Sequence, residues 1–409
     1  MATRSFLFVL CLAFACTIDS RHLDHHHHHH SKQHRVRHLW DIIKGKFIDK
    51  FNFDNRHFRQ HEMLLFPDIG FQSLNNNDTW KIIVHGWKYE NPVRKSWLEI
   101  GADVWMAKFT RNLINQNDKL TINGSINYDR LRTFFVSDES NKLIKILIGD
   151  HEKSLSTDKY GQFLDQIDMT NQDVQKLKKE QGSDNVINYE ATSNDNPKSI
   201  GIIRLIEPRH GISVISDIDD TIKISEVFDK IRLIANTFIF PFKPVPGMSD
   251  LYQQWQKSNK NCTFHYLSGM PDQLYTLTQE FIDDNNFPDG SFHMRHFGWA
   301  IGTLFDFIHP EATFNHKISY LRFFLSNTIR DFVLVGDSGE KDPETYATIT
   351  KEYPERIRAI FIRAVKGESP SDQRFLNAFQ SIPKEKWLIF DDPKQIPIDL
   401  SRAPRAIFS

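Results

Sequence analysis

The chain of 409 residues contains 40% hydrophobic and 12% aromatic residues, enough to bury the cores of two domains or slightly more. Its 51 Lys and Arg residues nearly balance its 52 Asp and Glu residues, and the formal net charge is −1. This composition indicates a globular protein, and the charge balance gives no reason to expect nucleic acid or another strongly charged partner.

The first twenty residues have the layout of a secretory signal peptide. Arg4 precedes an apolar run from about Phe6 to Cys16, and small and polar residues follow that run. The run falls short of the roughly twenty residues that cross a bilayer, and no later segment is long and apolar enough. The sequence therefore predicts a signal peptide over residues 1–20 and a secreted or secretory-pathway luminal protein.

Residues 21–74 combine a histidine tract with a basic amphipathic pattern. The tract from His25 to His30 is consistent with an engineered tag, a natural low-complexity run or a metal-binding tail. In residues 35–51, apolar residues recur at helical spacing and basic residues lie between them. Such a helix would lie on an anionic membrane surface or pack against its own domain, and Gly45 weakens the helical pattern.

The segment 75–208 is rich in short strand patterns that Asn, Asp, Gly and Ser clusters separate. A helical pattern of comparable strength occurs near Asp173 to Gln181. We therefore predict a β-sandwich-like accessory domain over these residues. The predicted strands are 80–89, 131–140, 142–150, 161–169 and 199–207.

In the segment 209–409, apolar strands alternate with segments of helical period. Strands without an exposed face, separated by helices, are typical of a mostly parallel sheet that carries helices on both faces. The segment is therefore predicted to be an α/β catalytic domain. The predicted strands are 212–216, 262–268, 331–337 and 357–365, and the predicted helices are 248–258, 271–284, 316–326 and 342–354.

Polar residues follow three of these strands, at the edge where ligands bind in open parallel sheets. Each taken alone is an ordinary turn or capping residue. Several carboxylates that converge on one crevice need a cation, and an all-oxygen ligand set favours Mg²⁺ over Zn²⁺. The residues concerned are Asp217 and Asp219 after the first strand, Ser268 after the second, and Asp337 and Asp342 after the third.

These residues form an ordered set of motifs that resembles the haloacid dehalogenase superfamily. The set is D-I-D-D-T, a strand that ends in Ser, the helix-borne Lys317, and VLVGDSGEKD. The longer stretches GISVISDIDDTIK, FHYLSGMP, VGDSGEKDPETY and RAIFIRAV resemble the catalytic domain of the actin-patch-associated phosphatidate phosphatase family. The resemblance is dense over about residues 201–365, and it implies a haloacid-dehalogenase-like, Rossmann-like fold.

The resemblance also implies chemical roles for the first motif. Asp217 would attack phosphorus and form an aspartyl-phosphate. Asp219 would protonate the leaving oxygen and then activate the water that cleaves the intermediate. Asp220 is expected to be structural, and Thr221 to support the backbone.

The remaining motifs would bind the phosphoryl group and the metal ion. Ser268 would donate a hydrogen bond to a phosphoryl oxygen, and Lys317 would offset the charge on the phosphate and the nucleophile. The alternative for Lys317 is an exposed helix lysine. Mg²⁺ would be held by the side chains of Asp217 and Asp337, the backbone carbonyl of Asp219 and, directly or through water, Asp342.

The residues between the motifs give information about the size and kind of substrate. The interval from Asp217 to Ser268 leaves no room for a large cap domain. It contains residues 227–247, VFDKIRLIANTFIFPFKPVPG, which would form an apolar flap that meets lipid or would pack in the core. Arg295 and Arg363 would reach a phosphate head group or act as surface and ion-pairing residues.

We therefore expect a Mg²⁺-dependent phosphatidate phosphatase that releases diacylglycerol and phosphate from a phospholipid at a membrane surface. One alternative is a phosphatase for another phosphomonoester. Another is a membrane- or protein-binding module whose phosphatase domain is secondary, as the basic helix and the β-rich segment suggest. Intact carboxyl groups at Asp217 and Asp219 favour an enzyme, because a pseudoenzyme needs neither group.

Overall fold

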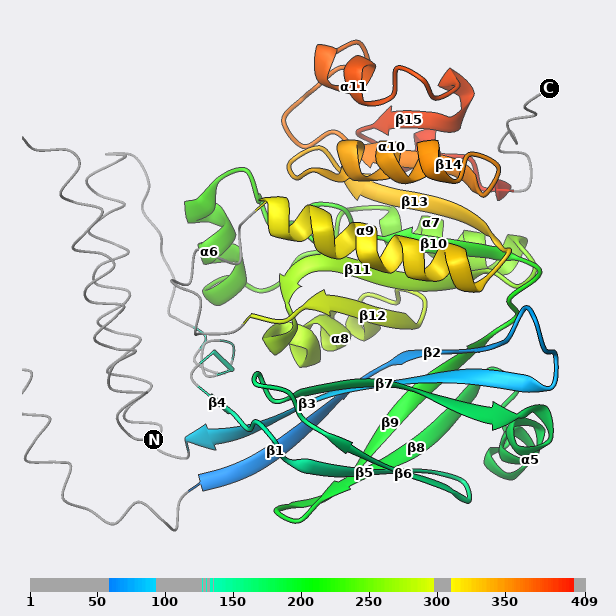
Figure 1. Cartoon of the computed structure of the whole chain (residues 1–409). Coiled ribbons are helices and arrows are strands. Elements are labelled where there is room, and N and C mark those ends of the chain that lie inside the picture. The colour runs from blue at the N-terminus through cyan, green and yellow to red at the C-terminus, as the bar shows by residue number, and fades with distance from the viewer. Residues whose placement is uncertain are drawn as a thin grey trace, which may run out of the picture.

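The structure, a computed structural model, describes residues 59–92, 127, 130, 133–134, 136–297 and 310–400. The predicted signal peptide, the histidine tract and the basic helix lie outside the described residues. The described chain contains a mostly antiparallel sheet below a parallel sheet, as viewed in Figure 1. Among these residues, no helix has both the length and the apolar composition that a membrane crossing requires.

The antiparallel sheet has nine strands in the order β1-β3-β2-β9-β8-β5-β6, and β4 and β7 both pair with β3. Its strands alternate buried and exposed residues, as along β5, because one face covers an apolar core. The nine strands are hydrogen-bonded into a single sheet, and the predicted sandwich stays a prediction. The strands are β1 (Arg59–Phe66), β2 (Asp68–Gln72), β3 (Thr79–Pro92), β4 (Ser137–Asp138), β5 (Leu143–Ile148), β6 (His151–Ser156), β7 (Gln162–Thr170), β8 (Val186–Ser193) and β9 (Asn196–Ile206).

Helix α5 (Asn171–Gln181) packs on this sheet, which confirms the helical pattern predicted there. The Thr170 side chain caps its first turn by accepting a hydrogen bond from the Asp173 amide, and Gly182 ends it in the left-handed region at φ 65°. The helix buries Val174 and Leu177 in the core of the antiparallel sheet.

The parallel sheet has six strands in the order β12-β11-β10-β13-β14-β15, and every pair is parallel. The parallel α/β architecture predicted for this part of the chain is therefore confirmed. Strands β10 and β13 are neighbours at the centre, with Ser216 opposite Val335. The strands are β10 (Ile212–Ser216), β11 (Thr263–Pro271), β12 (Gly290–Arg295), β13 (Asp331–Asp337), β14 (Ile357–Arg363) and β15 (Trp387–Phe390).

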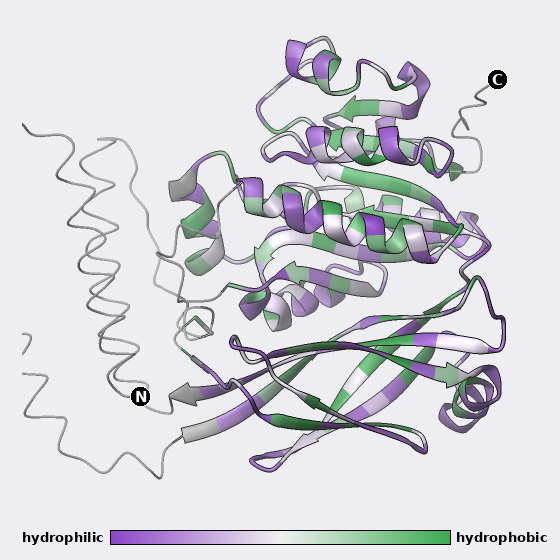
Figure 2. Ribbon diagram, viewed as in Figure 1, coloured by the Kyte–Doolittle hydropathy of each residue, from purple (hydrophilic) through white to green (hydrophobic). Residues whose placement is uncertain are grey.

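Helices cover both faces of the parallel sheet, because successive strand residues point to opposite faces. Val214 belongs to the core cluster that contains Trp255 of α7, whereas Ile215 belongs to the cluster that contains Leu321 of α9. Figure 2 shows the strands of this sheet as largely hydrophobic segments between mixed helices. The helices are α6 (Lys230–Phe238), α7 (Met248–Ser258), α8 (Tyr275–Asp284), α9 (Pro310–Asn327), α10 (Asp342–Glu352) and α11 (Gln373–Ala378).

The two sheets share a core. Phe66 and Trp87 of the antiparallel sheet belong to the same apolar cluster as residues of α7 and α8, and the Phe66 ring lies 5.3 Å from that of Tyr275. A backbone hydrogen bond of 2.9 Å from the Phe292 amide to the Pro67 carbonyl also joins the two parts. This contact predicts that the two parts stabilise each other.

Candidate active site

Two carboxylates meet at the carboxyl end of the parallel sheet because the strands that precede them are adjacent. Asp217 directly follows β10, and Asp337 is the last residue of β13. The Asp217 amide donates a hydrogen bond of 2.9 Å to the Val335 carbonyl, which continues the pairing of the two strands. Asp342 begins α10 and brings a third carboxylate to the same place.

The three carboxylates lie close together, and two of them pair with a buried lysine. Asp217, Asp337 and Asp342 each offer one carboxylate oxygen within 4.8 Å of those of the others, and all three residues are buried. Lys317 of α9 places its Nζ 2.9 Å from Oδ1 of Asp217 and 2.5 Å from Oδ1 of Asp342. Its side chain is 1% exposed, so the alternative of an exposed helix lysine is wrong.

Burial and neighbouring charges shift the pKa values of the side chains in this cluster. Loss of solvent raises the pKa values of Asp217 and Asp337 well above the ordinary range, and neighbouring carboxylates add to the effect. Burial also raises the pKa of Glu340, whose Oε2 lies 3.5 Å from Nζ of Lys317, to about 7. Burial opposes the charge on Lys317, but the carboxylates of Asp217 and Asp342 outweigh it and raise the Lys317 pKa.

The donor set fits a hard divalent cation. Within the described part of the chain, Oδ2 of Asp217 and Oδ2 of Asp337 are buried and have no hydrogen-bond partner. Unpartnered buried carboxylate oxygens are costly, and they are the ligands that Mg²⁺ prefers. One lysine also leaves an excess of carboxylates in the cluster, which a bound cation would reduce.

Asp219 points to a separate pair of side chains. Its Oδ1 accepts a 2.5 Å hydrogen bond from Oγ of Ser225 and lies 2.8 Å from Nζ of Lys223. Lys223 is buried, and its Nζ lies 4.4 Å from the centre of the Phe242 ring. The sequence interpretation overlooked both partners, although they stand in the same stretch of sequence.

The two residues after Asp219 shape the turn. Asp220 has a φ of 55°, and its carboxylate accepts hydrogen bonds from the amides of Ser225, Glu226 and Val227. This contact agrees with the structural role expected of Asp220. Within the described residues, Oγ1 of Thr221 is buried without a hydrogen-bond partner, so no side-chain contact supports the backbone role expected of it.

Ser268 lies on β11, the neighbour of β10 on the side opposite β13. It is two residues beyond Tyr266, which pairs with Ser216 at the end of β10, so it lies at the same edge as Asp217. The residue is buried, and its Oγ accepts a 3.0 Å hydrogen bond from the Met270 amide. That contact leaves the hydroxyl proton available to a phosphoryl oxygen.

Residues 227–247 do not form the exposed apolar flap that one interpretation expected. Phe238 is buried in the main core, and its ring lies 5.5 Å from that of Phe134. Arg130 donates hydrogen bonds to the carbonyls of Thr237 and Phe240, which fastens the end of α6. Among the residues of this segment whose burial the structure describes, Phe228 is a large apolar residue that is exposed, at 43%.

The predicted arginines are half-buried. Arg363 ends β14 beside Asp337, and its guanidinium donates a 2.7 Å hydrogen bond to the Asp220 carbonyl. Arg295 ends β12. Burial lowers the pKa of both side chains.

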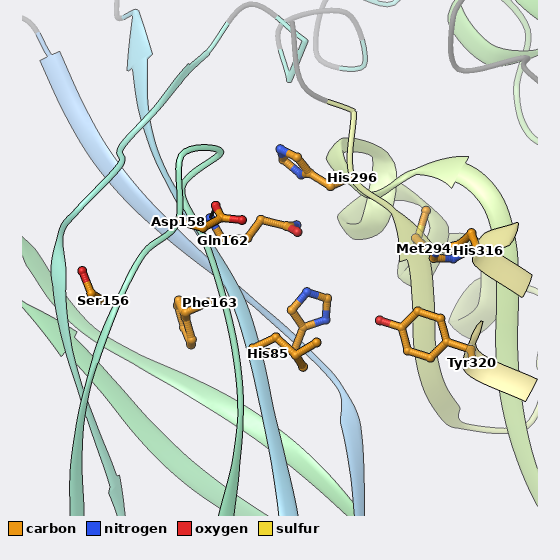
Figure 3. A pocket seen from close by; sticks show the side chains of 10 residues that line it. His85, Ser156, Asp158, Gln162, Phe163, Met294, His296, His316 and Tyr320 are labelled. Atoms are coloured by element: carbon orange, nitrogen blue, oxygen red, sulfur yellow. Dashed lines mark hydrogen bonds between the residues drawn. The ribbon is translucent and has the colours of Figure 1, made fainter. Parts of the chain in front are cut away.

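A separate polar cavity of about 380 Å³ lies between the two sheets (Figure 3). His85 and Gln162 line it from the antiparallel sheet, and His296, His316 and Tyr320 line it from the parallel part. Of the described residues that line it, none is a predicted site residue. The predicted catalytic residues lie instead in and around the carboxylate cluster.

Comparison with known proteins identifies the domain around this cluster. Residues 212–364 match the family described as phosphatidate phosphatase APP1, catalytic domain. This region of the chain is similar to the catalytic domain of APP1. This match supports the family and the enzyme class predicted from the sequence for this region.

Two curated relatives share this APP1 region. An uncharacterized protein of Schizosaccharomyces pombe is 37% identical over 164 residues, 39% of this chain and 26% of that protein. Phosphatidate phosphatase APP1 of Saccharomyces cerevisiae is 34% identical over 186 residues, 42% of this chain and 30% of that protein. The chain thus spans less than a third of the length of these two relatives.

A solved carbohydrate acetylesterase from Xanthomonas citri aligns over 73% of this chain and 68% of its own, at 7% identity and a TM-score of 0.24. A TM-score this low gives no information about the fold of this chain.

The prediction of a secreted or luminal protein is wrong. The Saccharomyces cerevisiae APP1 relative is a cytosolic actin-patch protein, which contradicts a secretory localisation. An arginine followed by a short apolar run is a weak indication, because neither feature is specific to export.

Proposed function

We propose that this chain is a Mg²⁺-dependent phosphatase that hydrolyses phosphatidate to diacylglycerol and phosphate, and that residues 209–409 form a haloacid-dehalogenase-like catalytic domain. The observation that carries the proposal is the buried Asp217, whose Oδ1 pairs with Lys317 while Oδ2 has no partner among the described residues. An orphaned carboxylate oxygen at the end of a central strand is a suitable nucleophile.

In the first step, a carboxylate oxygen of Asp217 attacks phosphorus, and the bond from phosphorus to the diacylglycerol oxygen breaks. Asp219 gives the leaving oxygen a proton. Its contacts with Ser225 and Lys223 both use Oδ1, so Oδ2 is the oxygen assigned to proton transfer. Lys317 holds Asp217 in place and offsets negative charge near the phosphoryl group.

In the second step, Asp219 takes a proton from water, and that water attacks phosphorus of the aspartyl-phosphate. The bond between Asp217 and phosphorus breaks, which frees phosphate and restores the carboxylate. Ser268 donates a hydrogen bond to a phosphoryl oxygen in both steps. Asp217, Asp337 and Asp342 would hold Mg²⁺, which when bound supplies positive charge that neutralises the phosphoryl oxygens.

We assign residues 75–208 as an accessory domain, and the substrate as a phospholipid that the enzyme meets at a membrane surface. The phosphatidate phosphatase description of the matched family supports this substrate class. The core shared by the two sheets predicts that the catalytic domain needs the accessory strands for stability.

The decisive test compares phosphatidate vesicles with a soluble phosphomonoester as substrates of the purified chain. We expect phosphate release from the vesicles, and rapid acid quenching with labelled phosphatidate should trap an acyl-phosphate on the wild-type chain. Asp217→Asn is the control that cannot form this bond. Turnover of the soluble ester without turnover of phosphatidate would refute the lipid assignment, and undiminished turnover by the Asn variant would refute the covalent mechanism.

A further inference from the structure

Arg374 lies in α11, ten residues beyond the end of the matched catalytic region, yet its guanidinium reaches the loop that carries two of the clustered carboxylates. It donates hydrogen bonds to the backbone carbonyls of Ser338 and Glu340. It also pairs with both carboxylate oxygens of Glu344 in the first turn of α10, at 2.8 and 3.0 Å. One side chain thus connects the loop to the helix that follows it.

The loop from Asp337 to Asp342 has little freedom to move without displacing a carboxylate. Oδ1 of Asp337 accepts hydrogen bonds from the amides of Gly339 and Glu340 within the loop. Gly336 lies so close to Asp342 that a Cβ at this position would come within 2.3 Å of its Oδ2. The loop backbone therefore determines where the Asp337 and Asp342 oxygens lie.

The neighbouring C-terminal segment provides a second connection. Oγ of Ser338 donates a 2.9 Å hydrogen bond to Oε2 of Glu368 and accepts one of 3.0 Å from the Val365 amide. These contacts hold one end of the loop, and Arg374 connects the Glu340 carbonyl in its middle to Glu344 of α10.

We propose that Arg374 is a positioning residue that sets the affinity of the Asp217, Asp337 and Asp342 cluster for its divalent cation. The inference rests on the proposed function, since it requires the cluster to bind a cation. The guanidinium fork is suited to this task because it donates to two carbonyls and a carboxylate at once, which a lysine ammonium does not match in geometry. Carboxylates held at fixed positions bind a cation without first having to be ordered.

Calorimetric titration of the full chain with MgCl₂ tests this inference without using activity. We expect Arg374→Gln to weaken Mg²⁺ binding about tenfold or more, with a circular dichroism spectrum like that of the wild type, and Arg374→Lys to restore only part of the affinity. The matched control is Arg322→Gln, which removes an exposed arginine paired with Glu352 near the other end of α10. The control should bind Mg²⁺ as the wild type does.

Equal Mg²⁺ affinity for wild type and Arg374→Gln would overturn the role of Arg374 and leave the proposed function intact. A wild-type chain that binds no Mg²⁺ would instead overturn the metal site of the proposed function, and this inference with it. If Arg374→Gln fails to fold, the Arg374→Lys variant provides the same comparison, because it keeps the charge and loses the fork. A Lys variant with full affinity would then overturn the inference.

Discussion

Nζ of Lys317 lies 2.9 Å from Oδ1 of Asp217, although 100 residues separate the two along the chain. Both side chains are 1% exposed. A buried lysine loses hydration and is stable in its charged form only beside carboxylates. The pair therefore joins the proposed nucleophile, which directly follows β10, to helix α9.

Replacement of Asp217 by Asn should abolish phosphatidate turnover and leave the free energy of unfolding unchanged or higher. The reason is that two other carboxylates, those of Glu340 and Asp342, pair with the same lysine, so removing one negative charge relieves repulsion. Phosphate release and urea unfolding measured on the same preparation check this. A variant that unfolds at much lower urea would show that the Asp217 contact with Lys317 dominates the repulsion.

Replacement of Lys317 by Met should have the opposite effect on stability. The variant leaves buried carboxylates without their cation, which costs about 3–5 kcal/mol when one partner of a buried pair is removed. We expect a lower midpoint of urea unfolding together with loss of turnover. Addition of Mg²⁺ should recover part of the stability, because a bound cation would replace some of the missing charge. An unchanged midpoint would contradict the central role of this lysine.

Removal of divalent cations by chelation should abolish phosphate release. We expect EDTA to stop phosphate release, Mg²⁺ to restore it and Zn²⁺ to be a poor substitute, because the cluster offers oxygen ligands without histidine or cysteine. Saturating Mg²⁺ should also raise the melting temperature of the wild type more than that of Asp337→Asn, which loses a proposed ligand charge. Turnover that survives chelation would indicate a metal-independent phosphatase.

Two phenylalanines of the segment 227–247 should behave differently on mutation. Phe238→Ser removes a buried ring and should destabilise the fold by about 3–5 kcal/mol, which lowers activity on vesicles and on soluble esters together. Phe228 is 43% exposed, and Nζ of Lys366 lies 5.2 Å from its ring. Phe228→Ser should lower only the activity on vesicles, because it removes an interfacial apolar contact. Equal activity of wild type and Phe228→Ser on vesicles would exclude Phe228 from membrane contact.

Asp68 should make stability depend on pH. It is 2% exposed, and burial raises its pKa from 3.8 to about 8, although a hydrogen bond from the Ile69 amide acts in the opposite direction. The folded chain therefore keeps a proton that the unfolded chain loses above pH 3.8, so this residue lowers stability as the pH rises toward 8.

Replacement of Asp68 by Asn removes this titration. Relative to the Asn variant, the wild type should lose roughly 3 kcal/mol of unfolding free energy between pH 5 and pH 7. Urea unfolding of both proteins at the two pH values measures the difference, in which the contributions of other titrating groups cancel. A difference that does not change with pH would show that Asp68 is ionised in the folded chain.

Local sequence patterns were enough to predict much of the structure of the segment 209–409. Apolar runs such as 212–216 and 331–337 are strands because their residues have no polar face, and a carboxylate directly after such a run must lie at the strand end. For this reason Asp217 and Asp337 could be predicted to meet before any contact was known. The order of the motifs also predicted correctly that Lys317 lies on a helix, which is α9.

Contacts across the fold depend on packing, which no local pattern encodes. Nothing in the sequence distinguishes the buried Phe238 from the exposed Phe228, because both stand in the same apolar stretch and differ only in what packs on them. Arg374 likewise looks like an ordinary helix arginine until α11 is placed against the loop. Spacing along the chain therefore determines which residues reach the end of each strand, whereas the way helices pack over the sheet determines which side chains hold those residues in place.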